Sequence, residues 1–228
     1  MLHYTRIWAV IIVSFVLVQL SHASIIYVDK SATGFNNGNS WTDAFVNLQN
    51  AINNATTGDR IWVAAGTYYP TTDRFGNSSP ADSRDLLFSL KDGVKLFGGF
   101  LGTETMLSER DPDLNPTILS GDIGVMGDST DNCYIVVLGI DLTEGSVFDG
   151  FRVRRANAVG TLFDTSDSTY SEAGAMRIED SRLTIRNTGF SGNYEGVGSG
   201  LHSIGSELRI VRCRFFNNTG TSAYSILL

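Results

Sequence analysis

The last quarter of the chain repeats itself: residues 175–193, AMRIEDSRLTIRNTGFSGN, align without a gap on residues 200–218, GLHSIGSELRIVRCRFFNN, at a period of 25 residues. A further period places Ile226 in register with Met176 and Leu201. A period in the twenties, made of short strands and small polar turns, is typical of a β-solenoid. A leucine-rich repeat is excluded because neither copy contains L-x-x-L-x-L. We therefore predict an all-β solenoid, a single-stranded parallel β-helix in which each copy forms one coil.

The repeat also predicts individual contacts between coils. Five pairs of similar side chains fall opposite one another: Met176 and Leu201, Leu183 and Leu208, Ile185 and Ile210, Phe190 and Phe215, Asn193 and Asn218. The same alignment places Arg182 beside Glu207, where opposite charges on adjacent strands attract. An earlier coil is found by matching Asp149-Gly150-Phe151 to Thr188-Gly189-Phe190, a spacing of 39 residues. The excess over 25 predicts a loop inserted at residues 159–172.

The N-terminus has the features of a secretory signal peptide. Arg6 precedes a largely apolar stretch of 14 residues, Ile7 to Leu20, and small residues at Ser21 and Ala23 suit cleavage after Ala23. This stretch is shorter than the ~18 residues that a membrane-spanning helix needs. We expect residues 1–23 to be removed and the protein to be secreted or held at the cell surface, with no membrane span after cleavage.

The net charge narrows the classes of partner, and the cysteine spacing argues against a disulfide. Without residues 1–23 the chain has 16 basic and 24 acidic side chains, a net charge of −8. Such a surface disfavours nucleic acid as a partner. Cys133 and Cys213 are about three coils apart, so their separation exceeds the ~7 Å that a disulfide tolerates between Cα atoms. We expect two free thiols.

Between the signal peptide and the repeats, the sequence predicts one helix followed by short strands. Trp41, Phe45, Leu48 and Ile52 recur at helical spacing after Ser40, a favourable N-cap, and Gly58 ends the pattern. We expect residues 24–58 to form a strand and an amphipathic helix that covers the open first coil. Residues 59–228 read as strands and turns, at 60–64, 67–71, 86–90, 94–97, 117–119, 134–138 and 147–154.

Several strings together resemble a known family. They are YVDKSATGFNNGNSW at 27–41, GDRIWVAAGTYYPT at 58–71, GVKLFGGFLGTETMLSERD at 93–111 and NPTILSGDIG at 115–124. They are similar to secreted bacterial right-handed parallel β-helix proteins of the pectin-lyase-like superfamily. The C-terminal repeats resemble the polymorphic outer membrane protein repeat, whose marks are a GGAI-like step and F-x-x-N. The resemblance implies a right-handed β-helix and export, and it leaves the activity open because this superfamily hosts lyases, hydrolases and adhesins.

Candidate ligand-binding residues lie on one strand and in the inserted loop. Alternation along the strand sends Arg152 and Arg154 outward, where they can meet an anionic glycan or pair with acids on adjacent coils. Phe163 and Tyr170 lie in the inserted loop and are suited to gripping a sugar. After signal cleavage His202 is the single histidine, so an H-E-x-x-H metal site is excluded. Alternation also places His202 on the outward side of its strand.

The richest acidic cluster lies at residues 121–132, GDIGVMGDSTDN. Asp122, Asp128, Asp131 and Asn132 offer the oxygen ligands that calcium prefers, without the spacing of an EF-hand. The alternative is a polar turn whose side chains bond their own backbone. A calcium site here would also serve a polysaccharide lyase, in which the metal neutralises a uronate.

Three functional hypotheses follow, and we favour the first. The first is an exported scaffold for adhesion or for binding an extracellular polysaccharide or cell-surface glycan on the strand face of the solenoid. The second is a calcium-dependent polysaccharide lyase or a glycoside hydrolase. In the third, the chain is a fragment of a longer surface protein, since residues 225–228 begin a further coil without the polar cap that a solenoid end requires.

Overall fold

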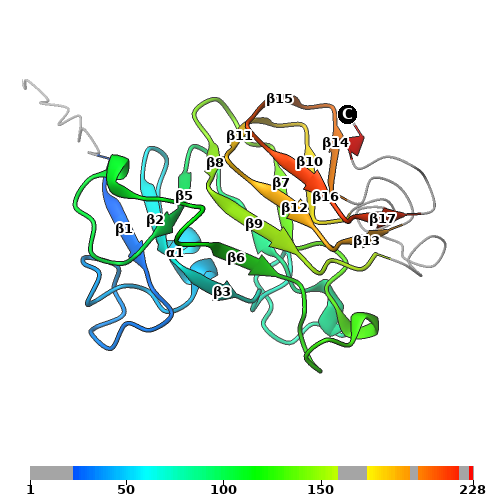
Figure 1. Ribbon diagram of the computed structural model, residues 1–228, viewed down its shortest axis with the longest axis horizontal. Helices are drawn as coiled ribbons and strands as arrows, with labels where there is room; N and C mark the ends of the chain where they lie inside the picture. Colours follow the sequence, from blue (N-terminus) through cyan, green and yellow to red (C-terminus); the bar gives the residue numbers. More distant parts are fainter. Residues whose placement is uncertain (1–22, 159–173, 196–199, 221–225, 228) are drawn as a thin grey trace, which may run out of the picture.

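A computed structural model describes residues 23–158, 174–195, 200–220 and 226–227 (Figure 1). The chain is all-β, and its described strands pair in parallel sheets. The first sheet contains β1 (Ile25–Val28), β2 (Arg60–Ala64), β5 (Lys95–Phe100), β8 (Val147–Asp149), β11 (Arg182–Arg186) and β15 (Glu207–Val211), in that order. The second contains β3 (Gly66–Tyr68), β6 (Thr117–Ser120), β9 (Phe151–Arg154), β12 (Gly189–Ser191) and β16 (Arg214–Phe216).

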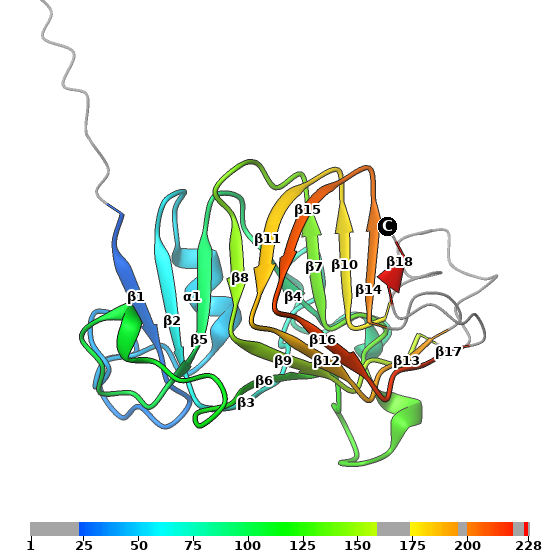
Figure 2. The ribbon, with the colours of Figure 1, turned by 45° about the horizontal axis from the view of Figure 1, so that its top comes forward.

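The third sheet contains β4 (Phe88–Ser89), β7 (Val137–Ile140), β10 (Met176–Glu179), β14 (Leu201–Ile204) and β18 (Ile226–Leu227). A short pair is formed by β13 (Tyr194–Glu195) and β17 (Thr219–Gly220). One α-helix, α1 (Leu48–Asn54), and three short 3₁₀ turns complete the described elements: η1 (Ser83–Asp85), η2 (Leu107–Glu109) and η3 (Ser129–Asp131). From β2 onward the chain visits the first, second and third sheets in rotation, so each sheet grows by one strand per round (Figure 2).

The repeat register is confirmed pair by pair. Met176 lies opposite Leu201, Leu183 opposite Leu208, Ile185 opposite Ile210 and Phe190 opposite Phe215. Ile226 pairs with Leu201, as the third period predicts. Arg182 lies opposite Glu207, and its Nε is 3.3 Å from Glu207 Oε2. The alternation of apolar and polar residues fixes this register, because a slip by one residue would turn every core side chain outward.

The F-x-x-N mark has a physical basis in stacking and hydrogen bonding between coils. The rings of Phe190 and Phe215 stack with centroids 4.8 Å apart. Asn193 is 1 % exposed; its Nδ2 donates to Asn218 Oδ1, and its Oδ1 accepts from Ala156 N. Each asparagine therefore satisfies polar groups of neighbouring coils where the strands end, and a buried polar side chain needs such partners.

One hydrophobic core cluster is shared by the three sheets. It includes Ile61 of the first sheet, Leu119 and Val153 of the second, and Val137 and Met176 of the third, each fully buried. The side chains that alternate with these point away from the core. On the first and third sheets several of them are buried in two further clusters, around Trp62 and Leu138, whereas Arg152 and Arg154 on the second sheet are partly exposed.

The predicted helix is shorter than expected. It begins at Leu48, with Asn47 as N-cap, and ends at Asn54, whereas the sequence pattern predicted a start at Ser40 and an end at Gly58. Phe45 instead bridges Val28 like a strand residue, its N–H donating to Tyr27 O and its C=O accepting from Asp29 N. Backbone pairing with β1 thus overrides the helical spacing of residues 41–45.

The helix does cover a sheet edge, through a glutamine. Gln49 is 2 % exposed; its Oε1 accepts from Ser89 N at 2.9 Å and its Nε2 donates to Ser89 O at 3.3 Å. The carboxamide therefore occupies the place of a neighbouring strand beside β4, the edge strand of the third sheet. An uncovered edge would recruit other strands.

Two details of the predicted strands are wrong. The expected strand 147–154 is broken at Gly150, whose φ is 86° and where a Cβ would lie 2.7 Å from Gly98 O. Phe190 lies opposite Val153 and not opposite Phe151, so the spacing between these coils is 37 residues, not 39. The turn at Gly150 explains the error, because the match on Gly189 aligned a corner glycine with a strand glycine. His202 alternates with the core residue Leu201 along β14, as expected, but it is only 2 % exposed, so this position is not open to solvent.

Candidate ligand-binding groove

A groove of about 640 Å³ lies on the outer face of the second sheet, between the loop that contains η2 and the last strands of the sheet. Figure 2 shows β6, β9, β12 and β16 side by side along this face. Five arginines line the groove: Arg110, Arg152, Arg154, Arg212 and Arg214. They come from the loop before β6, from β9, and from β16 and the corner before it. The groove is thus strongly basic in a chain whose formal net charge is −7.

Small residues of β12 form the floor of the groove. Gly189 and Ser191 lie on this strand, and both line the groove. Phe190, between them, points into the core and is fully buried. A side chain added at Gly189 would meet nothing within 4 Å. The floor is therefore open above the backbone of β12.

Two rows of side chains run across the three neighbouring strands. Gly189 pairs with Arg152 of β9 on one side and with Arg214 of β16 on the other. Ser191 pairs with Arg154 and with Phe216, which is 47 % exposed. Since adjacent strands are ~4.8 Å apart, the backbones of β9 and β16 are about 10 Å apart across the floor.

The arginines of β9 and β16 have few partners. Arg152 Nη2 is 3.7 Å from Asp113 Oδ1, and the Asp113 side chain is 86 % exposed, so the pair is weak. Arg154 Nε is buried without a hydrogen-bond partner in the described residues. Arg214 is exposed, and its side chain has no hydrogen bond or ion pair within that same part of the chain.

Burial and repulsion between the arginines both disfavour the charged form of Arg154. Partial burial, together with the positive charges of Arg152 and Arg155, lowers the pKa of the Arg154 guanidinium. A lowered pKa means that the charged form is disfavoured where it stands. An anion bound in the groove would relieve that cost.

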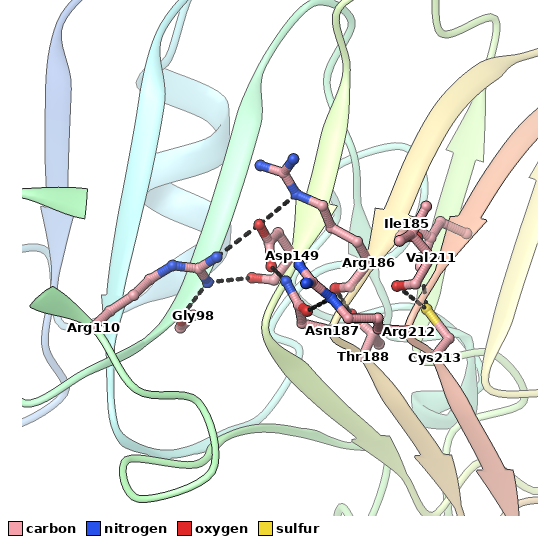
Figure 3. Close-up of polar contacts among 10 residues, drawn as sticks. All are labelled: Gly98, Arg110, Asp149, Ile185, Arg186, Asn187, Thr188, Val211, Arg212 and Cys213. Carbon is pink, nitrogen blue, oxygen red and sulfur yellow. Dashed lines mark hydrogen bonds and ion pairs between the residues drawn. The ribbon is translucent and has the colours of Figure 1, made fainter. Parts of the chain in front are cut away.

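The other two arginines belong to a buried carboxylate network (Figure 3). The Asp149 side chain is 1 % exposed; its Oδ2 lies 2.7 Å from Arg110 Nη2 and 2.6 Å from Arg186 Nε. Its Oδ1 accepts from Asn187 Nδ2, and Asn187 Oδ1 accepts from Arg212 Nε. Arg110 Nη1 also donates to Gly98 O at 2.7 Å. Asp149 therefore compensates Arg110 and holds the loop that contains η2 against the stack, while Arg152, Arg154 and Arg214 have no comparable acidic partner among the described residues.

Two of the four predicted ligand-binding residues lie in the groove. Arg152 and Arg154 both line the groove, on the outward side of β9. Phe163 and Tyr170 lie outside the residues that the structure describes. Sequence reasoning missed Arg214 and Phe216; a correct alignment of β9 on β12 would have placed them in the same rows as Arg152 and Arg154, one strand further along the sheet.

The acidic loop bonds its own backbone. Asp122 Oδ1 accepts from Gly127 N, Asp128 Oδ1 from Thr130 N and Asp131 Oδ2 from Val125 N. The second carboxylate oxygen of Asp131 and Oδ1 of Asn132 are buried and have no hydrogen-bond partner in the described part of the chain. Among the described residues no three histidine, cysteine or acidic side chains form a group that could hold a metal ion. Calcium at this loop stays a prediction.

Comparison of the chain with protein-family models, with curated proteins and with solved structures gave no match. Within the described residues no helix is long and apolar enough to cross a membrane.

Proposed function

We propose that this protein is an exported scaffold, secreted or held at the cell surface, that binds an acidic extracellular glycan in the arginine groove. On this proposal the stack is a right-handed parallel β-helix of the pectin-lyase-like superfamily with polymorphic outer membrane protein-like repeats. The rotation of the chain through three parallel sheets and the 25-residue register support that fold. The resemblance of the N-terminal strings supports the family, and the apolar N-terminus supports export.

One observation carries the functional part: five arginines gather in one groove of a chain with a formal net charge of −7. Burying or crowding cations has a cost that only anions or hydrogen-bond acceptors offset. Asp149 compensates Arg110, whereas Arg152, Arg154 and Arg214 lack a strong acidic partner among the described residues. An acidic polysaccharide supplies the missing carboxylates or sulfates, and the exposed Phe216 ring offers a face on which a sugar can stack.

The experiment compares binding of acidic and neutral glycans by the secreted form of the protein. We expect binding to uronate-rich or sulfated glycans that weakens with salt, because exposed charge pairs are screened. Replacing Arg152 or Arg214 with Gln removes a charge-assisted hydrogen bond worth about 1.5 to 3 kcal/mol, which is roughly a 10- to 150-fold loss of affinity. Arg209→Gln is the matched control, since Arg209 lies on the neighbouring β15 but outside the groove.

Two results would contradict the proposal. Equal binding of neutral and acidic glycans would show that the arginines do not select the ligand. Release of unsaturated products from a uronate polymer in the presence of calcium, abolished by Arg154→Gln or Asp128→Asn, would make the protein a lyase and not a binding scaffold.

A further inference from the structure

The floor of the groove contains a glycine that the fold does not need. Gly189 lies within β12, its φ is outside the left-handed region, and an added Cβ would meet no atom within 4 Å. Gly150, by contrast, has a φ of 86° and a backbone oxygen 2.7 Å from the place of a Cβ. Glycine inside a strand weakens it and often marks a site where a ligand approaches closely. The missing side chain at Gly189 therefore leaves room above the strand, not inside it.

The room above Gly189 is flanked by positive charge on both sides. Arg152 and Arg214 are the direct register partners of Gly189 on β9 and β16. Their backbones are about 10 Å apart, two strand spacings, so two long side chains can converge over the strand between them. An oxyanion in this space accepts from both guanidinium groups, whose planar forks suit carboxylate and sulfate.

The next row along β12 has a different character. Ser191 has its side chain on the same face as Gly189, about 7 Å along the strand, and Arg154 and Phe216 are its partners. This row combines a hydroxyl, a cation and an exposed ring. A sugar ring can stack on Phe216 while its acid group reaches back to Gly189.

Resting on the proposed function, we infer that Gly189 determines specificity: one acid group of the glycan lies over it between Arg152 and Arg214, and the sugar chain runs along β12, across the stack of strands. The ligand is then a short acidic segment. β12 has three residues, so its floor is about 10 Å long and holds about two or three sugar units.

The test fills the space above Gly189 without changing any charge. Gly189→Val adds a β-favouring side chain in open space, so we expect the same thermal stability as the parent and at least a tenfold loss of affinity for an oligogalacturonate or for dextran sulfate. Gly189→Ala should give a smaller loss. Thr184→Val, on the neighbouring β11 and outside the groove, is the control and should bind like the parent. The carboxylate and sulfate probes together identify which acid group the floor accepts.

Length dependence tests the direction of the ligand. Affinity for oligogalacturonates should stop rising at about three units, since the floor ends there. Affinity that keeps rising well beyond this length would place the ligand along the stack and overturn the inference. If Arg152→Gln abolishes binding while Gly189→Val leaves it unchanged, the inference is wrong and the proposed function stands. If the parent binds neither acidic probe, both are wrong.

Discussion

At the scale of single residues, Asp149 is the carboxylate that holds the loop containing η2, which forms one side of the groove. It is the buried acceptor for Arg110 from the loop and for Arg186 from the next coil, and it reaches Arg212 through Asn187. Two cations converge on one carboxylate whose side chain is 1 % exposed. Removing that charge would leave Arg110, 11 % exposed, without an acidic partner among the described residues.

We expect Asp149→Asn to lower the free energy of unfolding by about 3 kcal/mol, since breaking a buried ion pair strands the remaining charge. Chemical denaturation of the two proteins measures the difference. Asp113→Asn is the control: its carboxylate is 86 % exposed and 3.7 Å from Arg152, so its loss should cost less than about 0.5 kcal/mol. Equal effects of the two substitutions would contradict the network in Figure 3.

At the scale of elements, α1 is a short helix whose role is to cover an edge. It has seven residues, too few to be stable alone, and Leu48, Ala51 and Ile52 pack it into the core. Gln49 supplies what a neighbouring strand would supply to β4, one donor and one acceptor for Ser89. The helix and the edge strand therefore stabilise each other.

Gln49→Leu should cost about 1 to 3 kcal/mol, because the N–H and C=O of Ser89 lose their partner. We also expect faster aggregation, since the edge of β4 becomes free to pair with other chains. Thermal unfolding and light scattering report the two effects. Asn50→Ala, on the exposed side of the same helix, should be close to neutral. Wild-type stability of Gln49→Leu would mean that the edge is covered by another part of the chain.

At the scale of the whole molecule, one core cluster joins strands from β1 to β14. Cys133, in the chain just before β7, is fully buried, and burial raises the pKa of its thiol to about 12. Cys213 lies in the corner between β15 and β16 and is half-buried, and burial raises the pKa of its thiol too. Neither cysteine forms a disulfide, as the sequence predicted.

Alkylation at pH 8 should therefore modify Cys213 well before Cys133. The thiolate is the reactive form, and a thiol with a pKa of about 12 has roughly one ten-thousandth of it at this pH. We expect Cys133 to react only as fast as the molecule unfolds, as followed by mass spectrometry on Cys133→Ser and Cys213→Ser variants. Modification of both thiols at the same rate in the folded protein would show that the middle of the stack opens locally.

The sequence by itself determined the strand register of the C-terminal repeats and the outward position of Arg152 and Arg154. Both follow from local rules: side chains alternate along a strand, and a repeat stacks on itself, so the pairing of Phe190 with Phe215 and of Arg182 with Glu207 needs no further information. The beginning of the helix did not follow, because the helical spacing of Trp41 and Phe45 competes with backbone pairing between Phe45 and β1.

Only the tertiary structure decided the groove. Arg110, Arg152 and Arg214 come from three segments far apart in the chain, and their meeting depends on the turn at Gly150 and on the loop before β6. The corner at Gly150 recurs in the later coils at Asn187 and Arg212, which also have a positive φ, whereas the loop before β6 lies outside the 25-residue repeats and is not set by their period. The physical reason is that a periodic pattern fixes neighbours along a sheet, whereas the shape of a surface depends on where the pattern is broken.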